Sequence, residues 1–144
     1  MEKRQKITVC AFIHKEDRLL IAKRAATKKF LPNKYELLGG HVEFGETAEE
    51  ALKRELLEEI KVNITIEMPF HTFTYLTDNE ETHCLEIDYF AYLDPADQEI
   101  KINPSDHSEY KWIKESEVSK YLDETDDERK AIESGFRLLK KMKL

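Results

Sequence analysis

The stretch Gly39–Val62, GGHVEFGETAEEALKRELLEEIKV, decides the fold of this chain. It begins as a glycine-rich loop and continues as an amphipathic helix. Residues 43–59 hold seven glutamates and only two basic residues, Lys53 and Arg54. So much negative charge in one short segment predicts a bound cation.

A capping box marks the start of the helix. Thr47 is followed three residues later by Glu50, and in this motif each side chain accepts a hydrogen bond from the backbone N–H of the other residue. The helix is therefore expected to begin near Ala48. At helical spacing one stripe of its surface is apolar and the neighbouring stripe is acidic. The apolar stripe is Ala48, Leu52, Leu56 and Ile60, and the acidic stripe is Glu55, Glu58 and Glu59.

The acidic stripe needs a compensating charge. Glutamates at i, i+3 and i+4 repel one another by a few tenths of a kcal/mol per contact. Carboxylate oxygens on one face suit Mg²⁺ or Mn²⁺, which keep several waters and share their remaining coordination with substrate phosphates. The alternative is a solvated acidic surface, which is the usual state of a run of charges.

The same stretch resembles the Nudix box. The residues that match this motif at its spacing are Gly40, Glu46, Arg54, Glu55, Leu56, Glu58, Glu59 and Val62, with Gly39 and Gly45 also where the family usually has glycine. Lys61 replaces the last glycine of the motif, and Leu38 replaces a common proline. We expect Lys61 to cost stability rather than chemistry, because lysine at a helix C-terminus complements the dipole and Asn63 can supply the left-handed cap.

This resemblance implies an α+β protein with the Nudix fold, an α/β/α sandwich around a mixed β-sheet, as a single domain over residues 1–144. It implies an enzyme that hydrolyses the phosphoric anhydride of a nucleoside diphosphate linked to a further group, with Mg²⁺ or Mn²⁺ as cofactor. Carried over residue by residue, Glu58 and Glu59 are the chief metal ligands, Glu55 is a ligand or the general base, and Gly39 is a ligand through its carbonyl. Arg54 orients the glutamates by ion pairing, and Glu46 brackets the loop.

Length, charge and cysteine content limit the classes of protein to which this chain can belong. A chain of 144 residues predicts one domain, and a net charge of −7 with a pI near 5.3 argues against an extended nucleic-acid surface. The N-terminal apolar run is too short and polar for a signal peptide or a membrane span. Cys10 and Cys84 have no CxxC spacing and are expected to be reduced core residues of a cytoplasmic protein. A homodimer is compatible with these properties.

Strand patterns surround the central helix. Expected strands are 7–14 and 18–24, joined as a hairpin, 35–38 leading into the glycines, 64–76 and 82–93 as a longer hairpin, and 110–113. Residues 25–34 are expected to form a mobile, ligand-facing loop, and residues 94–106 a second loop. One or two helical turns are expected at 115–121. A second capping box, Thr125 with Glu128, predicts the start of a final amphipathic helix.

Several residues outside the box are candidates for the site. Lys23 and Arg24, at the end of a strand, and His41, beside the glycines, are candidate phosphate contacts. Some family members carry the base on a loop before a late strand, and here Glu109 and Asp106 are the candidates. The aromatic residues of the long hairpin, Phe73 and Tyr75 among them, are expected in the core.

Substrate identity does not follow from the box. Downstream, Thr77–Glu80 matches neither the proline of ADP-ribose enzymes nor the tyrosine of dinucleoside polyphosphate enzymes. The leading hypothesis is a small-molecule nucleotide substrate such as a modified or unmodified nucleoside triphosphate. The alternatives are a non-catalytic Nudix-fold nucleotide-binding module, which usually loses box carboxylates, and an isopentenyl diphosphate isomerase, for which Cys84 is poorly suited.

Overall fold

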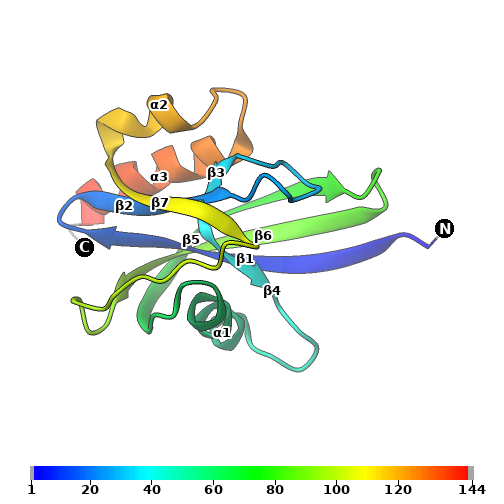
Figure 1. Cartoon of the computed structure of the whole chain (residues 1–144), viewed down its shortest axis with the longest axis horizontal. Helices are drawn as coiled ribbons and strands as arrows, with labels where there is room; N and C mark the ends of the chain where they lie inside the picture. The colour runs from blue at the N-terminus through cyan, green and yellow to red at the C-terminus, as the bar shows by residue number, and fades with distance from the viewer. Residues whose placement is uncertain (1, 143–144) are drawn as a thin grey trace.

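The computed structural model describes residues 2–142, and in it a mixed β-sheet lies between two helical layers (Figure 1). The strands are β1 (Arg4–Lys15), β2 (Arg18–Arg24), β3 (Tyr35–Glu36), β4 (Leu38–His41), β5 (Ile64–Thr77), β6 (Thr82–Leu93) and β7 (His107–Lys114). The helices are α1 (Ala48–Ile60), α2 (Val118–Tyr121) and α3 (Asp127–Met142), with a 3₁₀ turn, η1 (Glu115–Glu117), before α2. Helix α1 covers one face of the sheet and α2 and α3 cover the other, which confirms the predicted class and layering. Among the described residues, no helix is both long and apolar enough to cross a bilayer.

Strand β1 is the centre of the sheet. It pairs antiparallel with β4, where Cys10 lies opposite Gly39, and parallel with β6, where Cys10 lies opposite Asp88. Its predicted hairpin with β2 forms, but only through two residue pairs beside the turn. Strand β2 pairs along its length with β7 and near its end with β3. The longer predicted hairpin of β5 and β6 is also present.

Alternate residues of β1 face the two helical layers, because successive side chains of a strand point to opposite faces. On one face Val9, Ala11 and Ile13 pack with the apolar stripe of α1. On the other face Phe12 packs against α3, where a Cβ on Gly135 would lie 2.6 Å from the Phe12 ring. The predicted apolar stripe of α1 is buried except for Ala48, which is partly buried.

The ends of three strands differ from the prediction. Strands β1 and β7 are longer at their N-terminal ends than expected, because backbone pairing with β6 and β2 continues through polar residues. The glycines Gly39 and Gly40 are part of β4 rather than a loop after it. A Cβ on Gly39 would lie 1.9 Å from the carbonyl oxygen of Val9, so only glycine allows this close approach of β4 to β1.

The capping box predicted at Thr125 and Glu128 is wrong. Helix α3 begins at Asp127, and the Oδ1 of Asp126 accepts a hydrogen bond from the backbone N–H of Glu128 at 2.9 Å. The side chain of Glu128 is buried and its Oε1 accepts a hydrogen bond from the backbone N–H of Leu37 at 3.0 Å. The carboxyl group therefore faces the sheet instead of returning to its own helix.

The C-terminal end of α1 also differs in detail. Lys61 itself adopts the left-handed conformation, with φ 60° and ψ 38°, and Asn63 does not take this role. The Nζ of Lys61 donates to the carbonyl oxygen of Glu58 at 2.8 Å. A lysine is thus held where the family pattern has glycine, at a conformational cost of about 1–2 kcal/mol for a non-glycine residue.

We predict that Lys61→Gly is neutral or stabilising. Glycine removes about 1–2 kcal/mol of left-handed strain, which offsets the loss of one exposed hydrogen bond worth about 0.5–1.5 kcal/mol. Thermal unfolding with Lys61→Ala as the control separates the two effects, since alanine keeps the Cβ and loses the ammonium group. The alanine variant should melt below the wild type, and a glycine variant that melts equally low would contradict the prediction.

Candidate functional site

Arg54 of α1 binds the carboxylates of Glu46, Glu55 and Glu58. Its Nε and Nη2 donate to the two oxygens of Glu46 at 2.6 and 3.0 Å. Its Nη1 lies 3.0 Å from Glu55 Oε1 and 3.3 Å from Glu58 Oε2. Nη2 also donates to the carbonyl oxygen of His41 at 3.0 Å, so one guanidinium joins the helix to β4.

Glu46 fixes the loop between β4 and α1. Besides binding Arg54 at two points, its Oε1 accepts a hydrogen bond from the backbone N–H of Glu43 at 2.9 Å. The hydrogen bond from Arg54 lowers the pKa of Glu46 to about 2, so this carboxylate stays ionised. These contacts are those of a residue that brackets the loop.

Gly40 makes room for Glu55. A Cβ on Gly40 would lie 2.2 Å from the carboxyl carbon of Glu55, so this carboxylate occupies the space that any other residue would fill. Burial raises the pKa of Glu55, while the hydrogen bond from Arg54 lowers it. Glu58 is exposed by comparison, with 59% of its side chain accessible.

Glu59 is not among the carboxylates that Arg54 binds. It is half-buried, and its Oε2 is buried without a hydrogen-bond partner among the described residues. Burial, and then the charge of Glu55, raises the pKa of Glu59 to about 9. An unpartnered carboxylate oxygen beside further carboxylates fits a divalent cation, because hard oxygen donors with excess negative charge are the ligands that Mg²⁺ and Mn²⁺ prefer.

A cavity of about 880 Å³ begins beside Glu59. It lies over the face of the sheet opposite α1, below the loop of residues 25–34 and the segment before α3. The basic residues in its lining are Lys6, Arg24, Lys28 and Lys34. Gly39, Gly40 and His41 line the same cavity, so the glycines of the box form one of its walls.

Of the three candidate phosphate contacts, Arg24 and His41 line the cavity and Lys23 does not. Arg24 lines the cavity, but its guanidinium is held by Glu36 at 3.2 Å and by the carbonyl oxygen of Phe30 at 2.9 Å. His41 lines the cavity, with its Nδ1 3.2 Å from the Oγ1 of Thr8. Lys23 is not in the lining and its ammonium lies over the Tyr35 ring, 5.8 Å from the centroid.

Of the two candidates for a loop base, Asp106 lines the cavity and Glu109 does not. Asp106 lines the same cavity as Glu59, and its Oδ1 accepts a hydrogen bond from the Nζ of Lys28 at 2.8 Å. Glu109 is not in the lining and accepts a hydrogen bond from the Tyr35 hydroxyl, which lowers its pKa. Geometry therefore favours Asp106 over Glu109.

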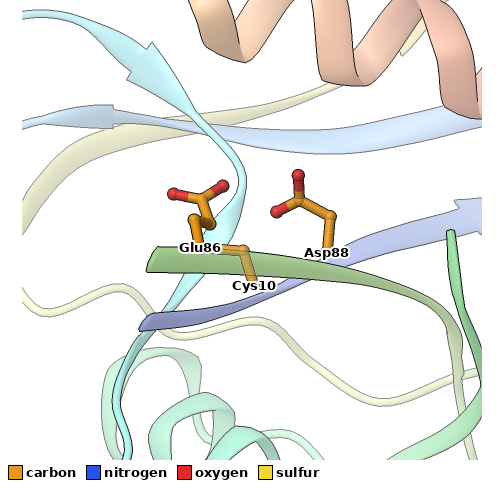
Figure 2. Close-up of side chains that lie close together, drawn as sticks. All are labelled: Cys10, Glu86 and Asp88. Carbon is orange, nitrogen blue, oxygen red and sulfur yellow. The ribbon is translucent and has the colours of Figure 1, made fainter. Parts of the chain in front are cut away.

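The sequence analysis missed a second acidic group, which lies on β1 and β6. Within residues 2–142, Cys10, Glu86 and Asp88 are the only three potential ligands whose donor atoms all lie within 4.8 Å of one another (Figure 2). Glu86 and Asp88 extend from β6 to the same side, next to Cys10 of β1. Cys10 and Cys84 are both free and buried, as expected. The missed signal was the spacing of Glu86 and Asp88, which puts two acids on one face of a largely buried strand.

The fold and the Arg54-centred site define a Nudix domain. The family model described as the NUDIX domain matches residues 4–134, and the chain belongs to this family. The nucleoside triphosphatase NudI of Escherichia coli O139:H28 (strain E24377A / ETEC) is 33% identical over 130 residues, which cover 82% of this chain and 88% of that protein. NudI of Shigella flexneri matches with the same values. The chain is accordingly a Nudix pyrophosphohydrolase.

Solved structures agree on the fold. The MutT protein from Methanosarcina mazei Go1 has a TM-score of 0.80 at 21% identity, covering 98% of this chain and 99% of that one. The E. coli ORF135 protein has a TM-score of 0.73 at 20% identity, covering 96% and 92%. At these identities the likeness concerns the fold alone.

We predict that Arg54→Lys lowers kcat/KM by about tenfold or more, because a lysine ammonium cannot bind Glu46 at two points and also hold Glu55 and Glu58. The matched control is Lys53→Arg, a substitution at the exposed neighbouring position, which should leave kcat/KM unchanged. Steady-state kinetics of both variants check the prediction. Full activity of Arg54→Lys would mean that the guanidinium contacts do not matter for catalysis.

Proposed function

We propose that this chain hydrolyses the pyrophosphate linkage of a nucleoside triphosphate, modified or unmodified, and that it requires Mg²⁺ or Mn²⁺. The observation that carries the proposal is the position of Glu59, whose unpartnered Oε2 lies at the edge of a cavity of about 880 Å³ with basic residues in its lining. Anionic phosphates attracted by these bases would lie beside the carboxylate cluster. A nucleotide fits a cation site that lies beside the lysine and arginine residues of the same cavity.

Glu55, Glu58 and Glu59 would hold the metal, with Gly39 as a further ligand through its carbonyl at the cavity wall. When bound, a divalent ion supplies positive charge to phosphate oxygens and lowers the pKa of a water molecule. Arg54 would orient Glu55 and Glu58 through the contacts that its Nη1 makes with both carboxylates.

Other residues of the cavity would bind the substrate. Lys28, Arg24 and His41 line the cavity and would contact phosphate oxygens, and Glu36 orients the Arg24 guanidinium. Asp106 is the proposed loop base, since its carboxylate faces the cavity near Glu59. Lys23 and Glu109 lie outside the cavity lining and have no part in the proposal.

The choice of a triphosphate draws on similarity to the nucleoside triphosphatase NudI. The non-catalytic module is disfavoured, because Glu55, Glu58, Glu59 and Arg54 are all retained. We place the activity in one domain over residues 1–144, since both helical layers pack on the same sheet. Two free, buried cysteines support a reducing, cytoplasmic location.

The test is a product screen with Mg²⁺ and with Mn²⁺ over nucleoside triphosphates, oxidised ones included, ADP-ribose, dinucleoside polyphosphates, nucleotide sugars and coenzyme A. We expect triphosphates to be cleaved, and Glu58→Gln to lower turnover by about 10² or more, as for loss of a major electrostatic contributor. Glu49→Gln, an exposed glutamate of the same helix, is the control and should be fully active. Unchanged turnover in Glu58→Gln at saturating Mg²⁺ would contradict the assignment.

We also predict that millimolar Mg²⁺ or Mn²⁺ raises Tm. Divalent ions should bind the folded cluster better than the unfolded chain, and the stabilisation is about 2.7 kcal/mol at a hundredfold excess over Kd. Thermal melts are compared in chelator, in metal, and in NaCl of matched ionic strength. The rise in Tm caused by the metal should be smaller in Glu58→Gln than in the wild type. If NaCl reproduces the whole shift, the glutamates are a screened acidic surface and not a metal site.

A further inference from the structure

The strand at one edge of the sheet, β5, is open along the second half of its length. The strand order ends at β5, which pairs with β6 on its inner side. Residues 71–77, HTFTYLT, pair one-to-one with β6 without a shift of register. Within the part of the chain that the structure describes, no backbone hydrogen bond reaches residues 71–76 from outside this pairing. We call residues 71–77 the open edge.

The open edge lacks the features that protect exposed strands. Native proteins cover or interrupt the free N–H and C=O groups of an edge strand with charged side chains, prolines and bulges. The first half of β5 has all three, with Glu67, Pro69 and two shifts of register before His71. The open edge has no Asp, Glu, Lys, Arg, Gly or Pro, although 37% of the whole chain is charged. Its Thr, Phe, Tyr and Leu residues favour a further pairing.

Strand β7 gives a contrast within the same sheet. It pairs with β2 alone among the described strands, so its other side is also without a strand partner. Three of its eight residues are charged, namely Glu109, Lys111 and Lys114. These charges are the protection that the open edge lacks. The difference between the two strands indicates a partner for β5 and none for β7.

Apolar side chains continue the open edge across one face of the sheet. Leu76 is 50% exposed, Leu85 38% and Ile7 45%. Ile7 lies opposite Leu85, and Leu85 lies opposite Thr74 of the open edge. This is the face that α1 covers further along, because Ile87 of the same strand packs against the core under α1. A strand added at the open edge therefore has exposed apolar surface beside it.

A second copy of this chain satisfies the open edge. A strand that pairs antiparallel with its own copy does so about a twofold axis, and each copy gives and receives the same hydrogen bonds. The net charge of −7 opposes contact between copies over the surface as a whole, but the open edge sets no charged side chain against its own copy. The axis stands perpendicular to the sheet, so the faces that carry Leu76 adjoin on one side.

We propose that two copies of this chain associate through the open edge, antiparallel, so that their two sheets continue as one. Assembly stops at the dimer, because the pairing uses β5 and the charges of β7 block a second contact of this kind. Phe73 and Tyr75 of the open edge line the cavity, so the second copy lies beside the cavity rim. The proposal does not depend on the proposed hydrolysis.

The first test is the mass of the full chain in solution. Sedimentation equilibrium from micromolar to near-millimolar protein should show a reversible step from 17.0 kDa to twice this mass. Hydrogen exchange at the two ends of this range should show that the amides of residues 71–77 become protected in the dimer. A monomer at every concentration, a series of species beyond the dimer, or protection confined to another surface would overturn the proposal.

A charge on the open edge tests the interface. Thr74→Lys brings two ammonium groups together near the twofold axis and should weaken dimerisation by about tenfold, since like charges on paired strands repel and an edge lysine blocks pairing. Ser108→Lys is the matched control, because it adds the same charge at an exposed position of β7. The control should dimerise like the wild type. Equal dimerisation of Thr74→Lys would overturn the proposal.

A mixture of two variants separates loss of pairing from loss of folding. Thr74→Glu should also dissociate when alone, because carboxylates then face each other across the axis. An equimolar mixture of Thr74→Lys and Thr74→Glu should form mixed dimers more tightly than either variant forms its own, since opposite charges now meet. Misfolded chains could not recover in this way. A mixture that associates no better than its components would exclude the open edge as the interface.

Discussion

The guanidinium of Arg54 is the interaction on which the rest of the site depends. This one guanidinium donates hydrogen bonds to the carboxylates of Glu46, Glu55 and Glu58. It also donates to the carbonyl oxygen of His41 in β4. It therefore sets the position of α1 relative to the glycine-bearing strand as well as the directions of the carboxylates. Glu59 is outside this network and lines the cavity, and its Oε2 has no hydrogen-bond partner among the described residues.

Much of this arrangement could be predicted from the sequence because it is local. The capping box at Thr47 forms as predicted, with Glu50 N–H to Thr47 Oγ1 at 3.1 Å, and helical periodicity then fixes which residues of α1 are buried. The proximity of Arg54 to Glu58, four residues later, follows from the same periodicity. The role of Gly40 requires three-dimensional information, since Glu55 contacts it across the gap between helix and strand.

What could not be predicted depends on pairings distant in sequence. Glu86 and Asp88 meet Cys10 only because β6 lies parallel to β1, and Glu128 joins them only because α3 packs over the same face. A local rule even gave the wrong answer for Glu128, since a capping-box pattern cannot reveal that the backbone N–H of Leu37 competes for the carboxylate. Arg24 similarly meets Glu36 through the pairing of β2 and β3.

The lining of the cavity depends on the register of β1. Its odd residues, Val9, Ala11 and Ile13, form the core under α1, so its even residues, including Thr8 and Cys10, must face the cavity. A shift of one residue would turn Cys10 toward α1 and bring an apolar residue of the core, Val9 or Ala11, to the cavity face. The close approach at Gly39 fixes this register, because a Cβ there would meet the Val9 carbonyl oxygen at 1.9 Å. Gly39, which itself lines the cavity, thereby also determines which residues of β1 face the cavity.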